Sequence, residues 1–405
     1  MSVNLPPLPV LLPVAGIRCA AIAAGVRKPG RRDLVLFELA AGSHVAAMFT
    51  TNRFRAAPVQ VAERHLEAAA VRYLLVNTGN ANAGTGEQGI ADALTCCAAA
   101  AELGGVSPEA VLPYSTGVIG ERLPAERITA GLPAAFAALQ ADQWADTALG
   151  IMTTDTAPKG ASVRLDTTVP CTLTGISKGA GMIRPDMATM LAFLATDAAV
   201  APAALEAMLR KAVAASFNRI TIDGDTSTND AVTLVATGAA GGALITDPDS
   251  PDGRLFAQAL TEQCTTLAQA IVRDGEGATR FVTVIVEGAR NSTEALAVAY
   301  AIAHSPLVKT ALFAGDPNWG RLLAAIGRAG LDDLDVTGVT LHLGDVLIAE
   351  RGSVASGYRE AQGAAVMAEA EVTIRAHLGR GTVSETVWTT DLSYDYVRIN
   401  AEYRS

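Results

Sequence analysis

The stretch from Gly175 to Asp197 constrains the fold of this chain more than any other. Its first half, from Lys178 to Asp186, is polar and glycine-rich and carries both charge signs. Its second half, from Met190 to Ala195, is an unbroken apolar run. A short run without alternation is typical of a strand buried on both faces, although a buried helix has the same pattern. The sequence therefore predicts a polar loop leading into a buried element, with Thr189 at the junction.

Thr189 has two interpretations from its surroundings alone. It is either an ordinary β-branched residue that begins a strand, or a hydroxyl group held at the edge of a cleft. The wider sequence favours the second. Residues 178–191 read Lys-Gly-Ala-Gly-Met-Ile-Arg-Pro-Asp-Met-Ala-Thr-Met-Leu, which resembles the signature of the ornithine acetyltransferase family of arginine biosynthesis. Six further segments resemble that family in the same order along the chain: residues 77–84, 115–120, 152–156, 223–230, 315–321 and 391–400.

The resemblance implies a self-cleaving enzyme of the N-terminal-nucleophile type. Cleavage between Ala188 and Thr189 would give an α chain of residues 1–188 and a β chain of residues 189–405 that begins with the nucleophile. We expect an α/β layered sandwich of mixed sheets covered by helices, organised in two interlocked lobes. The family also implies an α2β2 heterotetramer.

The chain offers a base for this chemistry without histidine. Its five histidines lie outside every motif, at positions 44, 65, 304, 342 and 377. An attack of Thr189 Oγ on the Ala188 carbonyl gives an ester by an N→O acyl shift, and water then releases a new α-amine. Such an amine has a pKa of about 7.7–8.0, so it can act as a base near neutral pH.

Two residues are candidates for an oxyanion hole. In Ser115-Thr116-Gly117 a hydroxyl group and a backbone N–H can point at the same spot, which suits the tetrahedral intermediate of acyl transfer. The resemblance assigns that role to Thr116 and Gly117. The resemblance also implies six substrate-binding residues, which are Thr154, Lys178, Thr189, Glu276, Asn400 and Ser405. Within the 152–156 motif, Thr154 is preferred over Thr153 as the substrate contact.

The implied reaction moves acetyl from N2-acetylornithine to glutamate through acetyl-Thr189. One pocket then accepts an ammonium tail and a carboxylate tail in turn, and Lys178 and Glu276 offer the opposite charges for that task. No cofactor or metal is expected. Acetyl-CoA remains open as an alternative donor, although no phosphate-binding glycine loop is recognisable, which favours acetylornithine alone.

Composition narrows the range of partners. The formal net charge is −10 and no basic stripe is present, which argues against nucleic acid. The N-terminus lacks the basic start of a signal peptide, and no apolar run reaches the roughly 18–20 residues of a membrane span, so we expect a cytoplasmic protein. Five cysteines without metal-ligand spacing are interpreted as buried free thiols.

Periodicity and capping residues predict the remaining elements. Helices are expected at 57–70, 87–103, 123–141, 202–217, 252–272, 292–304 and 319–329. Strands are expected at 14–24, 34–49, 71–76, 110–114, 219–222, 230–238, 280–287, 308–314, 336–343, 346–351, 371–376 and 387–390, with a hairpin at 159–169.

Three segments keep two interpretations. The Asn/Gly loop 77–86 is either a plain turn or a wall of the cleft. Residues 223–230 resemble a calcium loop but lack its terminal glutamate, which favours a polar active-site wall. Glu276 lies between two glycines, either in a surface turn or against the substrate. Residues 315–321 are given no chemical role.

Three rival functions differ in testable ways. An N-terminal-nucleophile aminopeptidase or amidase would share the chemistry but not the 178–191 segment. An acetyltransferase of secondary metabolism would use other acceptors on the same scaffold. A binding protein without activity would leave the chain uncleaved.

Overall fold

The computed structural model describes residues 2–27, 29–184 and 190–402. The chain divides into two compact units. The larger unit comprises residues 7–218 and 226–271, and the smaller unit comprises residues 1–6, 219–225 and 272–405. Strands on both sides of position 188 belong to the larger unit, so these units are compact regions of the fold and are distinct from the predicted cleavage products, the α chain of residues 1–188 and the β chain of residues 189–405, which remain a prediction.

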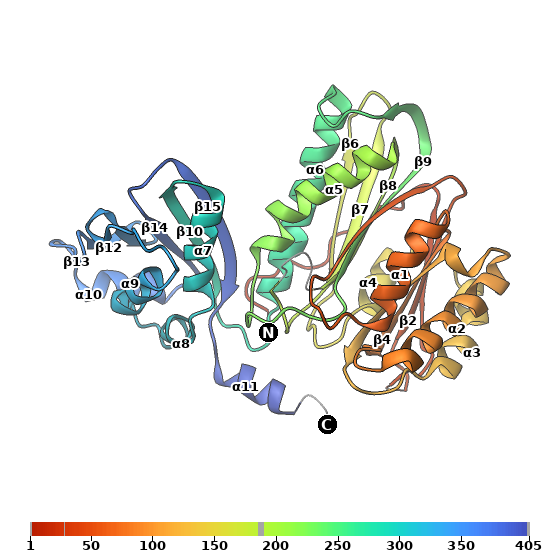
Figure 1. Cartoon of the computed structure of the whole chain (residues 1–405), viewed down its shortest axis with the longest axis horizontal. Helices are drawn as coiled ribbons and strands as arrows, with labels where there is room; N and C mark the ends of the chain where they lie inside the picture. The colour runs from red at the N-terminus through yellow and green to blue at the C-terminus, as the bar shows by residue number, and fades with distance from the viewer. Residues whose placement is uncertain (1, 28, 185–189, 403–405) are drawn as a thin grey trace. The chain divides into compact units, whose positions relative to one another are not determined.

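Two mixed sheets form the centre of the larger unit (Figure 1). The four-stranded sheet has the order β1 (Ile17–Ile22), β2 (Leu34–Leu39), β4 (Tyr73–Asn80) and β5 (Val111–Val118). The five-stranded sheet has the order β3 (His44–Phe49), β9 (Ala231–Ile245), β8 (Leu191–Val200), β7 (Cys171–Lys178) and β6 (Lys159–Leu165). In each sheet one pair of neighbours is parallel, β4 with β5 and β8 with β9, and the others are antiparallel.

The two sheets pack face to face through one apolar core. Phe193 of β8 lies against Phe37 of β2 and Tyr114 of β5, with ring centroids 5.2 and 5.0 Å apart. The hydroxyl group of Tyr114 also bonds to Thr233 Oγ1 of β9 at 2.7 Å, which ties the sheets together inside the core. The predicted apolar run at 190–195 is therefore a strand buried on both faces, and the helical alternative is wrong.

Helices cover the outer faces of both sheets. They are α1 (Ala57–Ala68), α2 (Gly86–Gly104), α3 (Ala125–Ala137), α5 (Pro202–Ala215) and α6 (Pro251–Arg273), with a 3-10 turn η1 (Pro108–Ala110). Helix α4 (Trp144–Gly150) instead contacts strands of both sheets, and its Trp144 and Ala148 belong to the core between them. Helices α2 and α3 pack on the four-stranded sheet through a second apolar core. Helix α5 packs on β3 and β9, and Gln263 of α6 donates to the Leu173 carbonyl of β7 at 2.8 Å. The result is a helix–sheet–sheet–helix arrangement, which confirms the predicted α/β layered sandwich.

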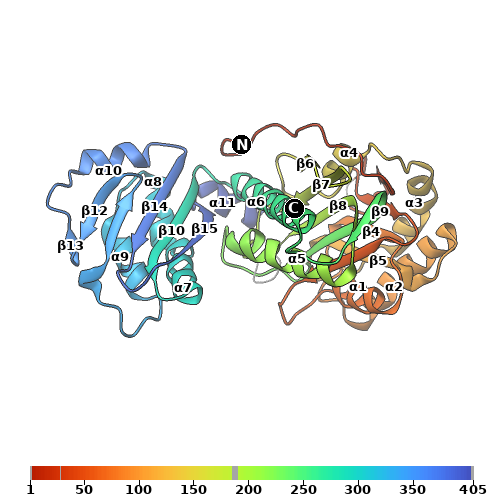
Figure 2. The ribbon, with the colours of Figure 1, turned by 90° about the horizontal axis from the view of Figure 1, so that it is seen from above.

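The smaller unit has one mixed six-stranded sheet. Its order is β13 (Ser353–Val354), β12 (Val346–Glu350), β11 (Thr340–Leu343), β14 (Glu371–His377), β10 (Phe281–Ala289) and β15 (Val383–Thr390). Its helices, seen from a second direction in Figure 2, are α7 (Ser292–Ala303), α8 (Pro306–Ala314), α9 (Trp319–Gly327), α10 (Glu360–Met367) and α11 (Tyr394–Ala401), with a 3-10 turn η3 (Val336–Gly338). A further 3-10 turn, η2 (Phe217–Arg219), lies where the chain passes from the larger unit to the smaller one. Helices α7 to α10 share one core with the sheet.

The expected helices are confirmed, but several expected strands differ from the structure. The single strand predicted at 34–49 is two strands, β2 and β3, which belong to different sheets because the chain turns at residues 40–43. The strand predicted at 308–314 is wrong, because α8 occupies this segment. The strand predicted at 219–222 is also wrong: η2 ends at Arg219, and Ile220 makes only an isolated bridge to Trp388. The hairpin predicted at 159–169 is the single strand β6, which pairs with β7.

All five cysteines are buried and free, as predicted. Within the described residues, no single helix is long and apolar enough to span a membrane; only α7 and α8 taken together, bent by 56°, pass by length and composition.

Candidate active site

The paired ends of β4 and β5 present the predicted oxyanion residues. Thr116 and Gly117 lie within β5, opposite Thr78 and Gly79 of β4, so the strand continues past the predicted end at Tyr114. Gly117 has φ +138°, and a Cβ there would lie 2.3 Å from the Gly79 carbonyl carbon. Only glycine fits this approach. The glycine of the Ser-Thr-Gly pattern thus allows β4 and β5 to approach closely directly after Thr116.

Lys178 at the end of β7 contacts the Thr116 hydroxyl group. Its Nζ donates to Thr116 Oγ1 at 3.0 Å, and Thr116 is only 7% exposed. Because Thr116 Oγ1 accepts a hydrogen bond from the charged Lys178 ammonium, the hydroxyl proton of Thr116 points to a different acceptor. The nearby positive charge also makes the Thr116 hydroxyl a stronger hydrogen-bond donor. This geometry suits a hydroxyl group that stabilises a developing oxyanion.

A buried ion pair connects the 152–156 motif to the residue after Lys178. Lys159 Nζ lies 2.7 Å from Asp155 Oδ1, with both side chains 0% exposed. The same oxygen accepts from the Gly179 N–H at 2.7 Å, and Asp155 Oδ2 accepts from the Thr153 N–H at 2.9 Å. Half-buried Thr154 is therefore held in a segment anchored beside the Lys178–Gly179 turn.

The environment of Asp155 favours its charged form. Burial alone would raise the pKa of this carboxyl group, but the charges of Lys159 and Lys178 and the hydrogen bonds from Lys159 and Thr153 hold it below its ordinary value. Asp155 was not predicted to be an anchor. The sequence feature that could have indicated this role is Lys159, an opposite charge four residues after Asp155 in a segment with few other charges.

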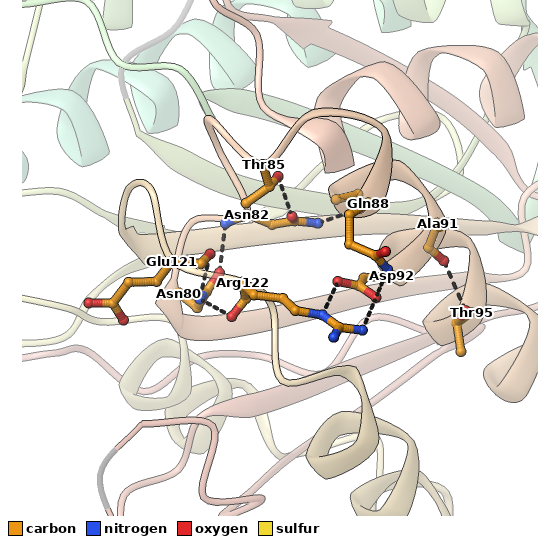
Figure 3. A network of polar contacts seen from close by, with 10 residues as sticks. Asn80, Asn82, Thr85, Gln88, Ala91, Asp92, Thr95, Glu121 and Arg122 are labelled. Atoms are coloured by element: carbon orange, nitrogen blue, oxygen red, sulfur yellow. Dashed lines mark hydrogen bonds and ion pairs between the residues drawn. The ribbon is translucent and has the colours of Figure 1, made fainter.

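The Asn/Gly segment 77–86 supports β5, the strand that carries the predicted oxyanion residues Thr116 and Gly117. Figure 3 shows its asparagines bonded to neighbouring backbone. Asn80 Nδ2 donates to the carbonyls of Glu121 and Arg122 at 3.2 and 3.0 Å, and Asn82 Nδ2 donates to Gly89 O at 2.9 Å. Asn77 Oδ1 accepts from Ser115 Oγ at 2.6 Å, directly before Thr116. The segment is thus neither a plain turn nor a loop throughout: residues 77–80 complete β4, Asn77 bonds to β5, and Asn80 bonds to the residues that follow β5.

The predicted nucleophile and cleavage position, Thr189 and Ala188, lie outside the described residues. The strand that follows them is fixed on both sides. Leu191 pairs with Lys178 of β7 and with Ala231 of β9, and the Ala231 N–H donates to Met190 O at 2.9 Å. Lys178 thus lies opposite a residue only two positions after Thr189 in the sequence.

The smaller unit contains the other predicted substrate residues. Asn400 Nδ2 of α11 donates to Glu276 Oε2 at 2.9 Å, so these two predicted contacts lie together. Glu276 is 8% exposed, which excludes the alternative of a solvated surface turn. Ser405 lies outside the described residues. Tyr396 was not predicted from the sequence; its hydroxyl group donates to Asp223 Oδ2 at 3.3 Å in the same acidic surroundings.

These features define a class: a layered α/β protein whose two packed sheets bring together an ammonium–hydroxyl pair suited to acyl transfer. Residues 18–405 match the model of the ArgJ family. The chain is 58% identical over 406 residues to the arginine biosynthesis bifunctional protein ArgJ of Pseudomonas syringae pv. tomato, and 58% identical over 409 residues to that of Pseudomonas fluorescens, with full coverage of both chains in each case. The chain therefore belongs to the ArgJ family.

Two solved structures are also similar to the chain. The arginine biosynthesis bifunctional protein ArgJ of Bacillus halodurans is 41% identical, covering 51% of this chain and 95% of that one, with a TM-score of 0.48. The ornithine acetyltransferase of Mycobacterium tuberculosis, complexed with ornithine, is 35% identical, covering 44% and 95%, with a TM-score of 0.40.

Proposed function

We propose that this protein transfers acetyl from N2-acetyl-L-ornithine to L-glutamate, giving L-ornithine and N-acetyl-L-glutamate in arginine biosynthesis. The observation that carries this function is the full-length identity to arginine biosynthesis proteins of the ArgJ family. The Lys178–Thr116 contact supports the chemistry, because it places a charged donor on a hydroxyl group next to Gly117.

The enzyme first matures by cutting itself. Thr189 Oγ attacks the Ala188 carbonyl carbon, the C–N bond breaks as the acyl group moves to oxygen, and water hydrolyses the ester. The products are an α chain that ends at Ala188 and a β chain with a free α-amine on Thr189. That amine then serves as the base in transfer.

Transfer follows a ping-pong course. The α-amine takes the Thr189 hydroxyl proton while Oγ attacks the acetyl carbonyl of acetylornithine, and the oxyanion is held by the Thr116 hydroxyl and the Gly117 N–H. Collapse of the intermediate returns the proton to the leaving nitrogen and releases ornithine. Glutamate enters, its amine attacks acetyl-Thr189, and N-acetylglutamate leaves with Oγ reprotonated.

Recognition uses groups of both charges. Glu276, held by Asn400, suits the ammonium of ornithine, and Lys178 suits a substrate carboxylate. An ammonium group has three N–H donors, so Lys178 can bond to Thr116 and to a substrate carboxylate at the same time. Thr154 and the terminal Ser405 supply further hydroxyl groups to the substrate.

The assembly is an α2β2 heterotetramer in the cytoplasm.

Acetyl-CoA-dependent acetylation of glutamate is the second candidate activity. The relatives from both Pseudomonas species are named bifunctional, which favours this addition. An assay with acetyl-CoA and glutamate, without acetylornithine, distinguishes the two cases: N-acetylglutamate forms only if the thioester acylates the same threonine.

Intact mass under denaturing conditions tests the mechanism first. The wild type should give two fragments that meet between Ala188 and Thr189, and Thr189→Ala should give one uncut chain without transferase activity. Thr189→Ser is the matched control, since it keeps a hydroxyl nucleophile and should still cleave. An uncut wild type that transfers acetyl would exclude the α-amine as base, and an uncut, inactive wild type would favour a binding protein.

A further inference from the structure

The segment of residues 391–393, between β15 and α11, connects the two residues proposed to recognise the ammonium tail. Glu276 lies in the loop before β10, and Asn400 lies on α11. All of these residues belong to the smaller unit. The contacts of residues 391–393 therefore determine how Glu276 and Asn400 are held relative to each other.

Asp391 binds the chain just before β10 with both of its carboxylate oxygens. Its Oδ1 accepts from the Thr279 N–H at 2.8 Å and from the Arg280 N–H at 2.9 Å. Its Oδ2 accepts from the Thr279 hydroxyl group at 2.6 Å. Asp391 is 4% exposed, and hydrogen bonds to a carboxylate are stronger than those between neutral groups. Thr279 and Arg280 are therefore held firmly to the end of β15.

Ser393, two residues further on, binds the turn that carries Glu276. Its Oγ donates to the Gly277 carbonyl at 2.6 Å, and the same oxygen caps α11 by accepting from the Tyr396 N–H at 3.3 Å. Gly277 has φ +66°, and a Cβ there would overlap the Tyr396 nitrogen, so only glycine allows this approach. The turn of Glu276 and the first turn of α11 are therefore packed directly against each other.

The bonds of Asp391 and Ser393 fix both partners of the Glu276–Asn400 hydrogen bond. Residues 277–280 hold Glu276 from its C-terminal side, and the capped helix α11 carries Asn400 about two turns after its cap. Asn400 Nδ2 donates to Glu276 Oε2 at 2.9 Å and to the Tyr396 carbonyl at 3.0 Å. The amide therefore reaches the carboxylate from a helix whose own position is already set.

A buried lysine fixes the same segment to α8. Lys309 is 4% exposed, and its Nζ donates to Thr389 Oγ1 at 3.1 Å and to both the hydroxyl group and the carbonyl of Thr390. Its own carbonyl accepts from the Leu392 N–H at 3.2 Å. Burial lowers the pKa of Lys309 to about 8, against negative charges of which Asp391 exerts the largest effect. The Asp391 carboxylate thus also favours the charged form of the lysine that anchors the end of β15.

We propose that Asp391 and Ser393 are positioning residues that fix the Glu276 carboxylate for the ammonium tail of acetylornithine. This inference rests on the acyl-transfer function proposed above. A carboxylate that is held in place before the substrate arrives loses less conformational freedom on binding. Loss of either positioning residue should therefore weaken the binding of acetylornithine more than that of glutamate, whose tail has no ammonium group.

The test is the KM for acetylornithine in Asp391→Ala, which removes all the bonds of this carboxylate to Thr279 and Arg280. In the acetylation half-reaction this KM should rise about fivefold, the size of one lost hydrogen bond, and the rate at saturation should stay within about twofold. In the second half-reaction the KM for glutamate should stay within about twofold of the wild-type value.

A double-mutant cycle separates positioning from a merely structural role. In the Glu276→Gln background, Asp391→Ala should raise the KM for acetylornithine by less than about twofold, because the residue at 276 no longer carries the charge that attracts the ammonium. Asp335→Ala is the matched control in the same unit. Asp335 accepts from the N–H and the hydroxyl group of Thr337 at 2.9 and 2.7 Å, as Asp391 does from those of Thr279, and its variant should keep both KM values.

Each other result overturns the proposal. An unchanged KM in folded Asp391→Ala, or an equal rise for both substrates, would show that Asp391 does not serve recognition of the ammonium tail. An undiminished rise in the Glu276→Gln background would show that the effect does not pass through Glu276. The same rise in Asp335→Ala would show that any such loss of contacts in this unit has this effect.

Two further measurements keep the test decisive. If Asp391→Ala does not fold, Ser393→Ala replaces it: this variant loses only the bond to Gly277 and the cap of α11, and its KM for acetylornithine should rise about threefold, an unchanged KM refuting the proposal. A wild type that transfers no acetyl refutes the proposed function instead. Hydrogen exchange then decides the positioning role by itself, because the amides of residues 276–280 should exchange faster in either variant, and unchanged exchange refutes that role.

Discussion

The Lys178–Thr116 region of the larger unit and the Glu276–Asn400 region of the smaller unit contrast in charge and in support. The first places a cation on a buried hydroxyl group, braced by an ion pair with both side chains 0% exposed. In the second region, the Glu276 carboxylate accepts a hydrogen bond from the Asn400 side-chain amide of α11. The described residues of α11 are half-exposed or exposed, and Tyr394 is 83% exposed.

This difference separates two tasks. Oxyanion stabilisation depends on donors that are fixed before the charge develops, and burial strengthens their effect. A site that accepts an ammonium tail and then a carboxylate tail needs partners that can adjust. The buried region is therefore suited to chemistry and the region on α11 to recognition, and the following substitutions test that division.

Asp155→Asn should have the largest effect on stability. It leaves the Lys159 ammonium buried without its counter-charge, which costs about 3–5 kcal/mol in the free energy of unfolding. It also loosens the segment that carries Thr154. Urea unfolding at neutral pH measures the loss, and a loss below about 1 kcal/mol would contradict the buried-pair interpretation.

The pH dependence gives an independent check on Asp155. Its pKa is lowered in the folded protein, so its contribution is present above the unfolded value of about 3.9 and is lost as pH falls below it. The wild type should lose more stability than Asp155→Asn on acidification. The double variant Asp155→Asn with Lys159→Met is the control, since it removes both charges and should recover part of the loss.

Thr116→Val should have the largest effect on catalysis. Valine keeps the shape and removes the hydroxyl donor, so kcat should fall about 10²–10³-fold. Thr116→Ser, which keeps the donor, should retain most of the activity. Pre-steady-state acetylation of the enzyme measures the step directly, and equal activity of the two variants would assign the oxyanion to the Gly117 N–H alone.

Much of the fold could be predicted because its signals are local. The apolar run at 190–195 and the amphipathic segment that became α6 specify their own structure. The wrong prediction of a strand at 308–314 also has a local cause, because the segment carries helix signals. Ser305 caps the helix, Pro306 is in its first turn, and Gly315 ends it with φ +69°. These helix signals outweigh a short apolar run.

The candidate site was less predictable because its contacts join distant strands. The contact of Lys178 with Thr116 depends on how two sheets pack, and the position of Lys178 opposite Leu191 depends on the register of β7 and β8. No spacing in the sequence encodes these relations. Glu276 and Asn400 were identified by resemblance, and their mutual hydrogen bond by the structure alone.

Glu276→Gln should have the smallest and most selective effect. The amide keeps a hydrogen bond with Asn400 but loses the charge that suits the ornithine ammonium, so KM for acetylornithine should rise about tenfold, equivalent to about 1.4 kcal/mol. The half-reaction with glutamate should be unchanged or improved, because a carboxylate tail no longer meets a negative charge. Asp395→Asn on α11 removes one exposed charge and should change neither half-reaction. Equal losses in both half-reactions of Glu276→Gln would mean that this carboxylate supports the common parts of the two substrates, and the division between a chemical and a recognition region would then fail at the residue on which it most depends.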